Sequence, residues 1–263
     1  MADPRASLVA CEVAVARGGR RVVEPLSFAL EPGTLTAICG PNGAGKSSLL
    51  MTLAGLLPIQ SGEVTLGGKT LASIPARERA RAIGYLPQDG ALAWDIAVLS
   101  LVALGRHPHG DAASPSGARA IATALADAQL HELARRPVSQ LSGGERARAL
   151  LARVLAGEPQ WILADEPLAA LDLAHQMRMM RRLRQFASAD DPQGPEQGVV
   201  VVVHDLAMAM NYADRVLVLK DGALIAEGPP EAALAPKVIA QGWGIAAQWL
   251  GESGERALRL PMG

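Results

Sequence analysis

A glycine-rich loop directly after an apolar strand constrains the fold of this chain more than any other feature. The run Leu35–Cys39 is apolar and leads into residues 40–47, GPNGAGKS. Apolar residues at 49, 50, 53 and 57 then mark one face of a helix over 47–57, which Pro58 ends. Backbone N–H groups of such a loop and of the helix N-terminus surround phosphate oxygens. The sequence therefore predicts a P-loop that binds a nucleotide.

The polar residues of this loop have distinct expected roles. Lys46 is expected to reach the β- and γ-phosphates, and the Ser47 hydroxyl to ligate Mg²⁺, which prefers hard oxygen ligands. The P-loop alone is compatible with kinases, GTPases and ATPases. The candidate nucleotide-binding residues here are Gly40, Pro41, Asn42, Gly43, Ala44, Gly45, Lys46, Ser47 and Ser48.

A second apolar run, residues 161–164, ends in two adjacent carboxylates, Asp165 and Glu166. Open α/β sheets place their ligand chemistry at the carboxyl ends of strands. We expect Asp165 to take part in the coordination shell of Mg²⁺, and Glu166 to orient and deprotonate an attacking water. The alternative for Glu166 is a helix-capping acid.

Composition limits the class of protein. The chain has 263 residues, 49% of them hydrophobic, and a net charge of -1, which fits one globular unit and predicts no nucleic-acid partner. Its two cysteines, Cys11 and Cys39, lie in apolar runs, and we expect both to be buried in a reducing compartment. Apolar stretches such as Val199–Val203 are far shorter than the roughly 18 to 20 residues that cross a bilayer. The N-terminus lacks the pattern of a signal peptide.

Strand and helix patterns alternate along much of the chain and predict an α/β fold. We expect one domain over 1–263, a P-loop NTPase (RecA-like) core with an N-terminal antiparallel β-subdomain and an inserted α-helical subdomain. Its expected parts are residues 1–88 (β-subdomain and first part of the core), 89–140 (helical subdomain), 141–228 (rest of the core) and 229–263 (C-terminal extension).

Residues 141–145, LSGGE, open a predicted helix with a hydroxyl and two glycines, which forms a second anion cradle. This run resembles the signature motif of the ABC ATPase family, and with the P-loop and the Asp-Glu pair it identifies the chain as a member. The resemblance implies ATP and Mg²⁺ as ligands and a head-to-tail homodimer, in which the signature of one chain meets ATP on the other. The residues implied to act across the dimer are Ser142, Gly143, Gly144, Glu145 and Asp172.

Other family positions are present in order. Gln88 resembles the Q-loop glutamine, which contacts Mg²⁺ and the γ-phosphate, and His204 resembles the switch histidine. The resemblance thus implies Glu166, His204 and Lys46 as catalytic residues, and Ser47, Gln88 and Asp165 around the metal. Many members carry an aromatic residue that stacks on adenine; this chain has Arg17 there, whose guanidinium can also stack on a flat ring.

Residues 85–88 (YLPQ), 102–109 (VALGRHPH) and 165–176 look like those of importers for iron-siderophore, haem and cobalamin. The resemblance implies two copies of a multi-helix permease docking near residues 89–106, an external substrate-binding protein, and a peripheral location on the cytoplasmic face of the inner (plasma) membrane. His107 and His109 have metal-like spacing, but a solvated loop is the favoured interpretation. The alternatives are an ATPase of iron-sulfur-cluster assembly and the ATPase of an ABC exporter.

Overall fold

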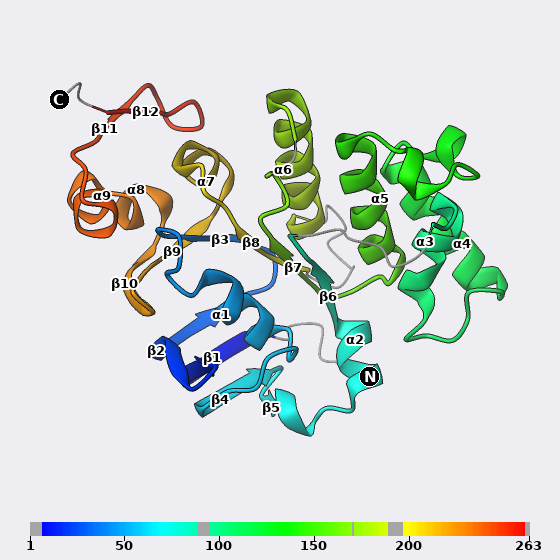
Figure 1. Cartoon of the computed structure of the whole chain (residues 1–263), viewed down its shortest axis with the longest axis horizontal. Coiled ribbons are helices and arrows are strands. Elements are labelled where there is room, and N and C mark those ends of the chain that lie inside the picture. Colours follow the sequence, from blue (N-terminus) through cyan, green and yellow to red (C-terminus); the bar gives the residue numbers. More distant parts are fainter. Residues whose placement is uncertain (1–6, 89–94, 170, 189–196, 261–263) are drawn as a thin grey trace.

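The computed structural model describes residues 7–88, 95–169, 171–188 and 197–260, and these residues form an α/β fold. A larger sheet crosses the middle of the molecule, with helices on both faces and a smaller antiparallel sheet below (Figure 1). The P-loop NTPase core expected from the sequence is present. The larger sheet has the order β10-β9-β3-β8-β7-β6, with β3 (Leu35–Cys39), β6 (Ile83–Leu86), β7 (Trp161–Asp165), β8 (Gly198–Val202), β9 (Arg215–Lys220) and β10 (Ala223–Gly228).

Strands β6, β7, β8, β3 and β9 pair in parallel, and β10 adds to the edge in antiparallel orientation. Alternate residues enter different cores: Val199 and Val201 pack with helices α5, α6 and α7, whereas Val200 and Val202 pack with α1. Parallel strands covered on both faces are continuously apolar, which is why these valines follow one another. The helices are α1 (Lys46–Leu53), α5 (Gly143–Ala156), α6 (Leu173–Ala187) and α7 (Leu206–Tyr212).

Helix α1 lies between the two sheets. Leu49, Leu50 and Leu53 share a core with residues of the antiparallel sheet. The helix ends at Leu53, not at residue 57 as predicted, because Gly55 adopts a left-handed φ of 67° that leads the chain away. The antiparallel sheet, in the order β2-β1-β4-β5, is formed by β1 (Leu8–Arg17), β2 (Arg20–Leu30), β4 (Ser61–Leu66) and β5 (Lys69–Thr70).

The described part of the segment that follows β6 consists of helices joined by turns; residues 89–94 of the predicted helical subdomain lie outside the described residues. Leu101, Ile121 and Leu151 join α3, α4 and α5 in one core. The subdomain boundaries stay predictions. The additional helical elements are η1 (Leu71–Ser73), α2 (Ala76–Ala82), α3 (Val98–Ala103), η2 (Leu104–Arg106), α4 (Pro115–Asp127), η3 (His131–Leu133) and η4 (Val138–Gln140).

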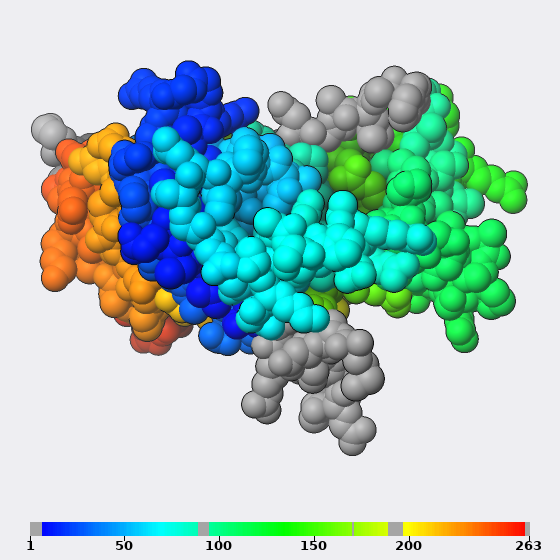
Figure 2. Space-filling model, turned by 90° about the horizontal axis from the view of Figure 1, so that it is seen from below, coloured from blue at the N-terminus to red at the C-terminus, as the bar shows by residue number. Residues whose placement is uncertain are grey.

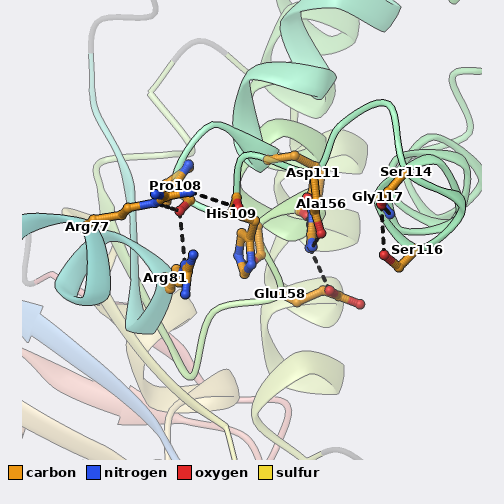
Figure 3. A network of polar contacts seen from close by, with 12 residues as sticks. Arg77, Arg81, Pro108, His109, Asp111, Ser114, Ser116, Gly117, Ala156 and Glu158 are labelled. Carbon is orange, nitrogen blue, oxygen red and sulfur yellow. Dashed lines mark hydrogen bonds and ion pairs between the residues drawn. The ribbon is translucent and has the colours of Figure 1, made fainter.

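Polar contacts tie the loop after α3 to its surroundings (Figure 3). The side chain of Arg106 is 4% exposed and forms ion pairs with Asp111 and Glu158, at 2.7 and 2.6 Å. Arg81 of α2 donates to the carbonyl of Pro108 at 2.9 Å. Seen from below, the cyan segment with α2 crosses the surface between the blue N-terminal strands and the green helical elements (Figure 2). These contacts fix the helical elements against the core.

The chain after β10 packs back on the core. Trp249 donates its indole N–H to the carbonyl of Leu234 at 2.8 Å, and Trp243 also packs on the hydrophobic core. Both tryptophans are therefore packing residues. Asn211 of α7 exchanges two hydrogen bonds with the backbone of Arg256, each 2.8 Å long. This segment comprises α8 (Pro230–Ala233), α9 (Pro236–Trp243), β11 (Gln248–Leu250) and β12 (Ala257–Arg259).

The prediction that both cysteines are buried is wrong for Cys11. Cys39 is buried in β3, but Cys11 is exposed on β1. An antiparallel sheet with one solvated face alternates buried and exposed residues, and Cys11 follows the buried Ala10 onto the solvent face. Within the described residues, no helix has the length and apolar character needed to span a membrane.

We expect Gly198→Ala to destabilise the fold by about 1–3 kcal/mol, because overpacking a buried site forces neighbouring atoms to shift. A Cβ atom at Gly198 would lie 2.3 Å from Cζ3 of the buried Trp161. The measurement is urea unfolding of both single variants and of Gly198→Ala with Trp161→Leu. The alanine penalty should shrink in the Trp161→Leu background; an equal penalty in both backgrounds would contradict the proposed clash.

Candidate nucleotide-binding site

The P-loop connects β3 to α1 and approaches neighbouring backbone closely. A Cβ atom at Gly40 would lie 2.1 Å from the carbonyl oxygen of Leu219, and one at Gly45 would lie 2.3 Å from that of Val22. Gly40 and Gly45 have positive φ angles of 151° and 94°, and Gly43, which has open space around it, has a φ of 78°. At positions 40 and 45 only glycine combines this backbone with so little space. The path of the loop therefore depends on these glycines.

Lys46 is the first residue of α1, and its side chain folds back over the loop. Its Nζ donates to the carbonyl oxygens of Gly40 and Pro41, each at 2.9 Å. The residue is 5% exposed. Burial lowers the pKa of its ammonium group, while the negative charge of Glu166 acts in the opposite direction. The loop carbonyls thus satisfy a buried cation at the position where phosphates are expected.

Ser47 and Asp165 bring two hard oxygen ligands together. The Ser47 hydroxyl donates to Oδ1 of Asp165 at 2.9 Å, and the Tyr85 hydroxyl donates to Oδ2 at 3.2 Å. Asp165 ends β7 and is 4% exposed. Burial raises the pKa of its carboxyl, against the effect of these hydrogen bonds, and it also raises the pKa of Tyr85. A hydroxyl beside a buried carboxylate fits the oxygen ligands that Mg²⁺ prefers.

Glu166 lies one residue beyond Asp165 but has a different backbone conformation, with a φ of 47°. Such left-handed geometry is uncommon for a residue with a side chain. Gln88 donates to its Oε2 at 2.6 Å, and Nε2 of His204 lies 2.6 Å from its Oε1. The structure therefore joins three of the predicted site residues at one carboxylate.

The signature residues lie at the start of α5. Ser142 accepts a hydrogen bond from the backbone of Glu145, and the Glu145 side chain accepts one from the backbone of Ser142, which forms a capping box. The hydrogen bond that the Glu145 carboxylate accepts from the Ser142 backbone N–H is the largest effect that lowers the pKa of Glu145. Asp172 caps α6 and pairs with Nδ1 of His175 at 2.8 Å. Gly144 lies beside the His175 ring, so the two helix starts are neighbours.

The structure brings together the P-loop, Asp165, Glu166, Gln88 and His204, which follow the carboxyl ends of β3, β7, β6 and β8. Gly143 lines a cavity of about 120 Å³ with Gln88 and Glu166. Among the described residues, no hydrogen bond links signature residues 141–145 to the P-loop.

Two further candidates lie elsewhere. Arg17 is exposed at the end of β1. His109 places Nε2 3.0 Å from the carbonyl oxygen of Gly157, and Asp111 pairs with Arg106. No group of three or more His, Cys, Asp and Glu side chains suited to a metal occurs in the described part of the chain.

Sequence reasoning missed the contact between Tyr85 and Asp165. In the parallel pairing of β6 with β7, Tyr85 lies opposite Leu163, and Asp165 follows Leu163 by two residues. Residues two apart share a face of a strand. A tyrosine near the end of a buried strand was the available signal, but strand order and register are not visible in the sequence.

Comparisons with known proteins agree with this geometry. The family model described as ABC transporter matches residues 23–169. The hemin import ATP-binding protein HmuV of Gloeobacter violaceus is 42% identical over 246 residues, which cover 90% of this chain and 87% of that protein. This chain therefore belongs to the ABC transporter family, as an ATP-binding subunit with ATPase activity.

Solved structures show the same fold. A dimeric ATP-binding cassette in a post-hydrolysis state, bound to ADP and phosphate, is 28% identical with a TM-score of 0.75, covering 85% of this chain and 98% of that one. A bacterial Atm1-family ABC exporter with ATP bound is 26% identical with a TM-score of 0.78; the match covers 93% of this chain but 42% of the exporter chain. The exporter contains additional chain beyond the shared region.

We expect Asp165→Asn to stabilise the ligand-free protein, because burial disfavours the ionised carboxyl. Folding raises the pKa of Asp165, so this group stabilises the fold at low pH and its contribution is lost as the pH rises through the raised pKa. The variant should melt about 2–4 °C above the wild type near pH ~8, with a smaller difference near pH ~4.

Differential scanning fluorimetry at both pH values measures this difference. Asp221→Asn is the matched control, because Asp221 is exposed in a turn. It should leave the melting temperature unchanged at both pH values. An Asp165→Asn variant that melts below the wild type at the higher pH would contradict the expectation.

Proposed function

We propose that this chain powers an ABC importer of an iron chelate, with haem as the first candidate cargo. The observation that carries the proposal is the 42% identity to a hemin import ATP-binding protein over 90% of the chain. The site supports the ATPase part of this proposal, since the residues that the family resemblance assigns to nucleotide and water lie together at the carboxyl ends of the strands. Siderophore or cobalamin import is the alternative cargo assignment within the same function.

In the proposed mechanism, the P-loop N–H groups and Lys46 bind the β- and γ-phosphates of ATP. Ser47, Asp165 and Gln88 would hold Mg²⁺, which would neutralise negative charge on the phosphate oxygens. Glu166 accepts a proton from a water whose oxygen attacks the γ-phosphorus, and the bond to ADP breaks. His204 orients this water and the γ-phosphate. Gln88 and His204 already contact Glu166, which supports these roles.

The signature residues act on the ATP of a second copy in this proposal. Their donors, Ser142, Gly143 and Gly144, lie at a helix N-terminus, where backbone N–H groups attract anions. Glu145 completes the capping box at the start of α5, and Asp172 caps the neighbouring helix α6. ATP then joins two head-to-tail copies, and hydrolysis releases them. The similarity to a dimeric ATP-binding cassette supports this arrangement.

A membrane permease completes the proposed transporter. Leu99 and Leu104, large apolar side chains that are 44% and 50% exposed, lie in the part of the predicted docking region that the structure describes. Two permease copies bind near residues 89–106 and hold the dimer on the cytoplasmic face of the inner (plasma) membrane. A substrate-binding protein delivers cargo to the permease. The single domain 1–263 moves as the ATP-driven part of this assembly.

We expect Glu166→Gln to bind ATP but to lose turnover by about 10²–10⁴-fold, because the amide cannot accept the proton of the attacking water. Phosphate release measures turnover, and size-exclusion chromatography with ATP should show a lasting dimer. Glu231→Gln, an exposed change on α8, is the matched control and should hydrolyse ATP like the wild type. Retained hydrolysis in Glu166→Gln would rule out Glu166 as the base.

The cargo is tested in the native host. Cells lacking this chain should fail to grow with haemin as the sole iron source, and wild-type chain but not Glu166→Gln should restore growth. The tagged wild-type chain should co-purify from detergent-solubilised membranes with a multi-helix permease. Unchanged growth, with recovery of soluble iron-sulfur assembly partners alone, would reject the import function and leave the ATPase chemistry standing.

A further inference from the structure

Both oxygens of the Asp165 carboxylate have a hydrogen-bond donor. Ser47 donates to Oδ1 from helix α1, and Tyr85 donates to Oδ2 from strand β6. The residue is 4% exposed, so little water reaches it. A buried carboxylate depends on protein donors for its orientation. The direction of this carboxylate is therefore set from two sides.

The two donors differ in what they can do when a cation binds. The Ser47 hydroxyl is itself a proposed ligand, so its oxygen would be shared between the cation and the hydrogen bond to Asp165. The Tyr85 hydroxyl contacts the other carboxylate oxygen and is not a proposed ligand. It is the donor that can keep the carboxylate in place throughout.

The position of Tyr85 is well defined by packing. It lies in β6, opposite Leu163 of β7, and its partly buried ring packs on the core that contains α1. Strand β6 is the edge of the larger sheet in the described structure and pairs with β7 over Ile83–Leu86. The phenol oxygen therefore approaches Asp165 from a rigid strand, as a positioning group requires.

We propose that Tyr85 is a positioning residue for the metal site: its hydroxyl holds Oδ2 of Asp165 so that Oδ1 faces Ser47 and the Mg²⁺ of Mg–ATP. This inference rests on the proposed ATPase function. Hydrogen-bond partners of metal-binding carboxylates orient these ligands, and their loss typically lowers metal affinity by about 10–100-fold. Tyr85 does not touch nucleotide or metal in this role.

The test is Tyr85→Phe, which removes the hydroxyl and keeps the ring. Isothermal titration calorimetry measures ATP binding in EDTA and then at increasing Mg²⁺, in a Glu166→Gln background that prevents turnover. The variant should need about tenfold more Mg²⁺ for half-maximal enhancement of ATP binding. Its ATP affinity in EDTA and its melting temperature should stay close to those of the parent.

Tyr212→Phe is the matched control. Tyr212 is the other tyrosine of the chain and ends helix α7, and the structure records no hydrogen bond for its hydroxyl among the described residues. The control should keep the Mg²⁺ requirement of the parent. A second readout, on chains with Glu166 intact, is the Mg²⁺ concentration that gives half-maximal ATP hydrolysis. This concentration should rise in Tyr85→Phe and stay unchanged in Tyr212→Phe. The KM for ATP at saturating Mg²⁺ should stay unchanged in both.

Each result has a clear meaning. An equal Mg²⁺ requirement in Tyr85→Phe and Tyr212→Phe would overturn the inference. Equal loss of ATP binding with and without Mg²⁺ would also overturn it, because Tyr85 would then act on the nucleotide site as a whole. If the parent and the control show no Mg²⁺-dependent ATP binding at all, the proposed function fails, independently of Tyr85.

Discussion

Parallel pairing of β3, β7 and β8 determines where the chemistry of this chain can occur. Ile38 lies opposite Val202, and Asp165 also lies opposite Val202, so the three strands end at the same level. The loops that follow these strands therefore all lie at the carboxyl-terminal end of the sheet, and they contain the P-loop, Glu166 and His204. The apolar strands that create this edge are buried on both faces. A buried, rigid sheet thus positions the polar side chains of these loops, whose contacts depend on their spacing.

Adjacent carboxylates at this edge have different environments because the backbone turns between them. Asp165 completes β7, is buried, and contacts side chains from α1 and β6. Glu166 takes a left-handed conformation, and its carboxylate meets Gln88 and His204. Backbone geometry of this kind costs about 1–3 kcal/mol and persists only where surrounding structure enforces it. Two neighbouring carboxylates can therefore have different proposed roles: Asp165 as a metal ligand and Glu166 as the base that accepts a proton from water.

The sequence was sufficient to predict β3 and β7, since each is a short apolar run, one followed by Gly40 and the other ending at Asp165 and Glu166. It also predicted that a helix begins at residues 141–145, with the Ser142 hydroxyl at its start, and α5 begins there. It could not predict the contact from Tyr85 to Asp165, which depends on which strand lies beside β7. The exposure of Cys11 was missed for a related reason: β1 looks like a buried strand until one face of its sheet is known to be solvated.

The bonds from Lys46 to the carbonyl oxygens of Gly40 and Pro41 have a consequence for how tightly a nucleotide can bind. A phosphate that enters the loop meets a lysine that already has intramolecular partners, so binding is an exchange of acceptors and its free energy is the difference between two sets of contacts. Before a phosphate binds, the two carbonyl oxygens hold the Lys46 ammonium group in a defined position over the loop. The loop consequently loses little conformational entropy when the phosphate arrives.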